Sequence, residues 1–125
     1  MANCETKLSP THIRYLLAMV SEQKLSGGLH CTSLAATLGV KKPSVHAMLG
    51  VLAQRGLVKR DAKGEMVLTS RGMQIGRRYQ KCFLAAGAIL KREFSEFCDE
   101  GEVCCLLLSK LSPAQLRALE HMQKI

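Results

Sequence analysis

Two adjacent lysines, a serine and a histidine lie at the start of a helical pattern in the stretch GVKKPSVHAML. Lys41, Lys42, Ser44 and His46 stand outside the apolar stripe of that helix, so they do not serve the core. Lysine attracts phosphate whatever the base sequence, whereas serine and histidine can hydrogen-bond to phosphates or to base edges. The stretch therefore predicts an exposed helix end that contacts a nucleic acid.

The positive charge of the chain is concentrated in residues 41–81. This segment holds ten basic and two acidic side chains, a net charge of +8 that equals the charge of all 125 residues. Such a concentration is typical of a surface that binds a polyanion, and a solvated basic face without a partner is the alternative. The basic residues are Lys41, Lys42, Arg55, Lys59, Arg60, Lys63, Arg71, Arg77, Arg78 and Lys81.

The six cysteines contain no C-x-x-C pair. The opening MANCETK has neither the basic flank nor the apolar stretch of a signal peptide, and no apolar run approaches the about 20 residues of a membrane span. We therefore expect a cytoplasmic protein whose thiols are reduced and pack as small apolar side chains.

Capping residues mark two helices near the start of the chain. Ser9, followed by proline, begins a helix over about 10–23. Thr32 is expected to cap a short second helix, and Gly39 to end it in the left-handed conformation.

A third helix over 41–55 and a two-stranded hairpin come next. The sequence LVKRDAKGEMVLT alternates apolar and charged residues around a turn, which predicts strands over about 57–60 and 65–69. The order helix, helix, turn, helix, hairpin is that of a winged helix-turn-helix, whose second helix lies in the major groove of DNA.

Further helices are expected after the hairpin. Thr69 or Ser70 can cap a long helix over about 71–92, and another helix is expected around the sequence VCCLLLSKL. Ser112 and Gln115 begin the last helix in an S-x-x-Q capping box.

The predicted fold class is mainly α, with a winged helix-turn-helix DNA-binding region over 8–70 and a helical extension over 71–125. Arg60 and Lys63 flank the hairpin tip, where they could enter the minor groove or touch the backbone, and Arg71 begins the following helix. Further basic residues of that helix are either weaker contacts or a solvated face: Arg77, Arg78 and Lys81.

Residues 8 to 92 resemble the iron- and manganese-dependent repressors, the family of the diphtheria toxin repressor and the manganese transport regulator. The matching motifs are RYLLAMV, LAATLGVKKPSVHAMLGVLAQRGLVKR and GEMVLTSRGMQIGRRYQK. The resemblance implies a transcriptional repressor that binds double-stranded DNA as a homodimer, with 71–125 as the dimerisation region. It adds Pro43 to the expected DNA contacts, while Ala47 stands where a polar base-reading residue is common. The expected contacts are Lys41, Lys42, Pro43, Ser44, His46, Arg60, Lys63 and Arg71.

The metal site of that family is not expected here. Its ligand positions fall on Arg14, Leu17 and Phe83, and only Glu100 and Cys104 remain as donors, whereas a specific divalent site needs four or more. We therefore assign no metal ligands and no cofactor, and Arg14 could pair with Glu100 in place of the metal. A soft-metal site is the alternative that stays open, with ligands Cys98, Cys104, Cys105 and His121.

Two other functions stay open. One is a MarR-like regulator that responds to an effector or to oxidation of Cys104 and Cys105, and the other is a winged-helix module that binds only protein. An enzyme is not expected, because no serine or cysteine has a motif-placed histidine base and no glycine-rich phosphate loop occurs. No catalytic residue is assigned.

Overall fold

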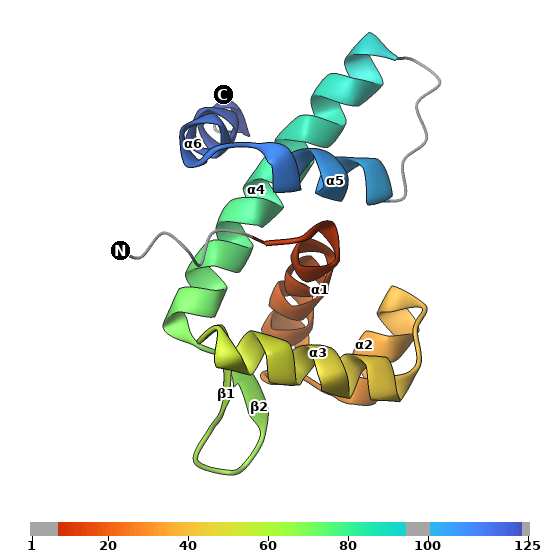
Figure 1. The fold of residues 1–125 in the computed structure, drawn as a ribbon, viewed down its shortest axis with the longest axis vertical. Helices are drawn as coiled ribbons and strands as arrows, with labels where there is room; N and C mark the ends of the chain where they lie inside the picture. Colours follow the sequence, from red (N-terminus) through yellow and green to blue (C-terminus); the bar gives the residue numbers. More distant parts are fainter. Residues whose placement is uncertain (1–7, 95–100, 124–125) are drawn as a thin grey trace. The chain divides into compact units, whose positions relative to one another are not determined.

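The structure is a computed structural model that describes residues 8–94 and 101–123. Its elements confirm the expected mainly α fold, a winged helix-turn-helix followed by helices (Figure 1). In chain order they are α1 (Pro10–Ser26), α2 (Cys31–Leu38), α3 (Lys42–Gln54), β1 (Val58–Arg60), β2 (Met66–Leu68), α4 (Ser70–Glu93), α5 (Glu102–Lys110) and α6 (Pro113–Gln123).

The chain divides into two compact units. The first, which we call the winged-helix unit, is Tyr15–Gly76, and the second, the helical unit, combines Met1–Arg14 with Arg77–Ile125. Both unit boundaries fall inside helices, one in α1 and one in α4.

Apolar stripes of the helices meet in the core of the winged-helix unit. The start of α4 lies close to this core, since a Cβ at Gly76 would be 2.5 Å from Cγ2 of Val20. A Cβ at Gly72 would overlap the backbone carbonyl of Leu57, so both positions require glycine. The fully buried core residues of this unit include Leu16, Met19, Val20, Leu34, Val45, Leu52 and Leu57.

The turn between α2 and α3 forms as predicted, with Gly39 in the left-handed conformation at φ 70°. The prediction that Thr32 caps α2 is wrong: the N-cap is His30, and its side chain makes no capping hydrogen bond. The backbone N–H of Leu29 donates to the carbonyl of Met66 at 2.9 Å. This bond holds the chain beside β2, and α2 begins two residues later.

The hairpin pairs β1 and β2 antiparallel, with Val58 opposite Leu68. Both strands are shorter than predicted, and β2 ends before Thr69 because that residue serves α4 instead. Its Oγ1 donates to the carbonyl of Gly56 at 2.7 Å and accepts from the N–H of Gly72 at 2.9 Å. Thr69 is therefore the side-chain cap of α4, one of the two residues predicted for that role.

Two reciprocal caps begin helices of the helical unit. The Ser9 hydroxyl accepts from the N–H of His12 at 3.1 Å, and the N–H of Ser9 donates to the His12 ring at 3.2 Å. Ser112 and Gln115 form the predicted capping box with bonds of 2.9 and 3.2 Å. The buried residues of this unit include Tyr79, Cys82, Ala85, Ala86, Cys104, Cys105, Leu108 and Leu116. Across residues 8–94 and 101–123, no helix is both long and apolar enough to cross a membrane.

Candidate nucleic-acid interface

An open groove of about 710 Å³ follows α3 in the winged-helix unit. Its walls are the N-terminus of α2, the exposed face of α3 and the hairpin, and Leu29, Leu49 and Met66 contribute its apolar lining. We call it the α3 groove. Its polar lining residues are His30, Cys31, Thr32, Lys42, His46, Lys59 and Arg60.

The groove brings together three of the predicted contact residues: Lys42, His46 and Arg60. They come from the first two turns of α3 and from the end of β1. All three are exposed, so their cationic or hydrogen-bonding groups lie on the same accessible surface.

The exposed face of α3 carries small residues in its second half. Lys42, His46, Gly50 and Ala53 recur at helical spacing, and each lines the groove. Apart from the adjoining backbone of its own helix and its chain neighbours, no atom lies within 4 Å of the position a Cβ of Gly50 would take, so the surface is open there. A broad ligand can therefore approach the backbone of α3 closely.

In the hairpin, Lys59 and Arg60 are neighbours in sequence and both are exposed. The guanidinium of Arg60 donates through Nη1 to the carbonyl of Gly64 at 2.8 Å. This bond holds the cationic group at the groove wall while its remaining N–H groups can reach a phosphate.

A hydrogen-bonded turn forms the hairpin tip. Oδ1 of Asp61 accepts from the backbone N–H groups of Lys63 and Glu65, each at 2.9 Å, and Gly64 takes a positive φ of 86°. Asp61 therefore serves the turn, and Lys63 is exposed at the tip.

The other predicted contacts lie outside the groove lining. Lys41 is the N-cap of α3, whose N-terminus has no side-chain cap. The partial positive charge of this helix end therefore adds to the lysine charges. Pro43 and Ser44 are exposed in the first turn of α3, and Arg71 is exposed at the start of α4.

The sequence reasoning missed Lys59 and the residues at the start of α2. Lys59 was counted among the basic residues but not assigned as a contact, whereas β1 buries only Val58 and leaves Lys59 exposed at the groove. Cys31 was expected to be buried, yet it lies partly exposed in the groove, with Sγ 3.8 Å from Nδ1 of His46. No sequence pattern joins these two residues, since 15 positions separate them.

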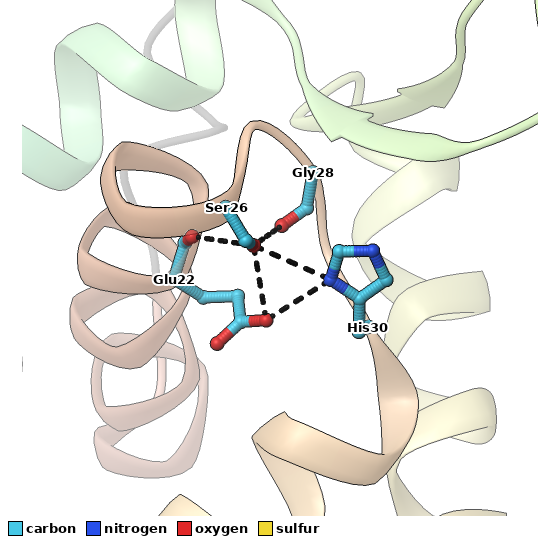
Figure 2. A network of polar contacts seen from close by, with 4 residues as sticks. All are labelled: Glu22, Ser26, Gly28 and His30. Carbon is cyan, nitrogen blue, oxygen red and sulfur yellow. Dashed lines mark hydrogen bonds and ion pairs between the residues drawn. The ribbon is translucent and has the colours of Figure 1, made fainter.

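A polar network fixes the N-cap of α2, which forms one end of the groove. Figure 2 shows Glu22 and Ser26 of α1 turned towards His30. Nδ1 of His30 lies 3.1 Å from Oε2 of Glu22 and 3.3 Å from Oγ of Ser26, whose hydroxyl is also 3.2 Å from the carbonyl of Gly28. The network ties the end of α1 to the start of α2.

Two basic residues of α4 have a partner in the helical unit. Arg78 and Lys81 approach the carboxylate of Glu120 at 3.5 and 3.8 Å. The single negative charge of Glu120 thus offsets part of their charge within the chain, which weakens their case as phosphate contacts. Arg77 is exposed.

A metal centre is not formed by the part of the chain that the structure describes, because no three His, Cys, Asp or Glu side chains gather there. Cys104 and Cys105 are each 2% exposed. Glu100, the expected partner of Arg14, and Cys98, an expected soft-metal ligand, lie outside the described residues.

Residues 16–62 match the family model of the IclR helix-turn-helix domain. This segment spans α2, α3 and β1 and most of α1. The match and the observed fold define the class of the chain as winged helix-turn-helix, the fold of DNA-binding transcriptional regulators. Comparison with curated protein sequences gives no significant match.

Three solved structures share the fold. IdeR of T. acidophilum is 15% identical with a TM-score of 0.67, covering 90% of this chain and 54% of its own. The manganese regulator SloR is 18% identical with a TM-score of 0.71, covering 94% of this chain and 55% of its own. A hypothetical protein of Sulfolobus solfataricus is 18% identical with a TM-score of 0.61, covering 92% of this chain and 88% of its own.

The present chain thus spans about half the length of IdeR and SloR. Identities this low establish the shared fold alone. The sequence match is to an IclR-type domain, so membership of the iron- and manganese-dependent family is not established by sequence.

Proposed function

We propose that this protein is a DNA-binding transcriptional regulator that places α3 in the major groove and the hairpin against the neighbouring backbone or minor groove. The observation that carries the proposal is the α3 groove, where Lys42, His46, Lys59 and Arg60 converge from two elements. The phosphate backbone of DNA is a polyanion suited to such a cationic groove, and phosphate contacts supply much of the affinity of DNA-binding proteins.

Base reading is assigned to the first two turns of α3. Ser44 and His46 are exposed there and can hydrogen-bond to base edges, and the exposed methyl group of Ala47 suits contact with a thymine methyl. Lys41, Pro43, Lys63 and Arg71 surround this face as backbone contacts.

We extend the proposal to a homodimeric repressor that acts in the cytoplasm, with residues 8–70 binding DNA and 71–125 joining the subunits. The exposed apolar side chains of α5 support self-association: Val103, Leu106 and Leu107 are 47, 52 and 39% exposed and recur at helical spacing. A symmetric dimer would bind two half-sites separated by one or more helical turns of about 10 base pairs.

We further propose that this chain binds DNA without a divalent metal, unlike the iron- and manganese-dependent repressors that its motifs resemble. Arg14 and Leu17, at two of the expected ligand positions, offer no metal donor, and Arg14 would repel a cation.

One experiment tests the DNA proposal. Chelator-treated protein is used to select bound sequences from random DNA, with and without added manganese, iron or zinc. We expect an enriched motif with paired half-sites in the chelated sample. Failure to enrich any sequence under all conditions would contradict the regulator and favour a protein-interaction module, and enrichment only with metal would contradict metal independence.

A second experiment tests the dimer. Sedimentation of the wild type should give a dimer, and Leu106→Glu should shift it towards monomer, because a charge at a buried apolar interface is unfavourable. Leu25→Glu is the matched control, since Leu25 is 88% exposed on α1 of the winged-helix unit. A monomeric wild type, or an equal shift in both variants, would refute this assignment.

A further inference from the structure

Cys31 differs from the other cysteines that the structure describes. Cys82, Cys104 and Cys105 are at most 2% exposed, whereas Cys31 is partly exposed at the wall of the α3 groove. The thiol of Cys82 donates to the carbonyl of Leu116 at 3.3 Å, and burial raises its pKa to about 11. Buried, protonated thiols react slowly, so Cys31 is the accessible nucleophile of this set.

A histidine stands beside this thiol. Sγ of Cys31, at the first residue of α2, lies 3.8 Å from Nδ1 of His46 on α3. A thiol and an imidazole in contact form the basic unit of an activated cysteine, because the ring can accept the thiol proton. The packing of α2 against α3 places the two residues together.

The surroundings of the pair suit a small anion. The groove volume of about 710 Å³ falls within the range of about 300–1,000 Å³ usual for small-molecule sites. Lys42, Lys59 and Arg60 line the same groove and can pair with carboxylates. The site therefore combines a nucleophile, a base and a cationic wall.

We propose that Cys31 is a modification site that forms a mixed disulfide with a small, carboxylate-bearing disulfide, and that this adduct switches off DNA binding. In the reaction, His46 takes the proton of Cys31, and the Cys31 sulfur attacks one sulfur of the incoming disulfide. A new S–S bond forms, the old one breaks, and the departing thiolate is protonated. The incoming disulfide is the oxidant, so electrons and atoms balance.

The effect on DNA rests on the function proposed above. An adduct at Cys31 would occupy the groove between α3 and the hairpin and place carboxylates beside Lys42 and Arg60. Disruption of one ion pair with a DNA phosphate reduces affinity about tenfold near 0.1 M salt, since affinity scales with salt concentration to a power of about −0.9 per neutralised phosphate. We expect the adduct to weaken DNA binding at least tenfold, and reduction to restore it.

The test treats the full chain with oxidised glutathione and, as a control of opposite charge, with cystamine. Peptide mass spectrometry follows the adduct at all six cysteines. We expect glutathione on Cys31 before any other cysteine, a slower reaction with cystamine, and a reaction at least fivefold slower in His46→Gln. Earlier modification of another cysteine, or an unchanged rate in His46→Gln, would overturn the site.

DNA binding is measured on the same samples, each variant being compared with itself before and after treatment. The wild type should lose affinity and recover it with dithiothreitol, whereas Cys31→Ser should show no change on treatment. A wild type that carries the adduct on Cys31 and keeps its affinity would overturn the switch. Absence of DNA binding in untreated protein would instead refute the regulator, and the mass spectra would still decide whether Cys31 is the modification site.

Discussion

Removal of the two lysine charges at the start of α3 should weaken DNA binding by an amount that depends on salt. Lys41 and Lys42 are exposed at a helix N-terminus, so Lys41→Gln with Lys42→Gln should change the free energy of unfolding by no more than about 0.5 kcal/mol. If each lysine neutralises one phosphate, the negative slope of log K against log salt becomes less steep by about 1.8 in the double variant. At 0.1 M salt this is a loss of about 60-fold, or about 2.5 kcal/mol.

Fluorescence anisotropy with a selected DNA duplex, at several salt concentrations between about 0.05 and 0.2 M, measures both quantities. The control replaces Lys91 and Lys110, which are exposed in the last turns of α4 and α5, by glutamine. It removes the same net charge from the helical unit and should leave the slope nearly unchanged. Equal losses in the two double variants would show that only net charge matters, and an unchanged slope in the α3 variant would refute the assigned contacts.

Three further predictions concern stability. Thr69→Val removes both hydrogen bonds of the α4 cap and should lower the free energy of unfolding by about 1 to 2 kcal/mol in urea titrations. Thr69→Ser keeps the hydroxyl and should retain most of that stability, and equal free energies of unfolding in the two variants would exclude the cap. Gly87→Ala should raise the free energy of unfolding by about 0.5 to 1 kcal/mol because open space surrounds this helical position. Gly76→Ala should instead lower Tm because the added methyl group crowds Val20. A higher Tm for Gly76→Ala than for Gly87→Ala would contradict this packing. Burial raises the pKa of Cys82 from 9.0 to about 11, so the folded state holds the thiol proton more tightly than the unfolded state. The contribution of the protonated thiol to folding stability is therefore complete below pH 9 and is lost as the pH rises through 11. Relative to Cys82→Ala, the wild type should lose about 2 to 3 kcal/mol across this window in urea titrations, and parallel pH profiles would disprove the shift.

The fold was predictable where neighbouring residues determine the structure. The cap at Ser9, the left-handed Gly39 and the pairing of Ser112 with Gln115 depend on contacts within a few positions, and all three appear as expected. Helix periodicity likewise gave the order of the elements, because each apolar stripe must be buried.

Contacts between distant residues were not predictable in the same way. The start of α2 follows the hydrogen bond from the N–H of Leu29 to the carbonyl of Met66 in β2, and this tertiary contact outweighs the local capping preference of Thr32. The contact of Cys31 with His46 likewise depends on how two helices pack. Three groove residues, Lys42, His46 and Arg60, could be predicted as contacts from residue type and from their places at a helix start and a hairpin tip, whereas the thiol beside them required the tertiary structure.

The hairpin tip has a consequence for the energetics of association. Asp61 binds the backbone of the turn and Arg60 is hydrogen-bonded to Gly64, so both the loop and its cation are already ordered before any partner arrives. Immobilising a long side chain on binding usually costs about 0.5 to 1.5 kcal/mol of conformational entropy. For the Arg60 side chain, much of that entropy is already lost during folding. Asp61→Ala would loosen the turn that holds Arg60, so it should weaken DNA binding even though it removes a negative charge.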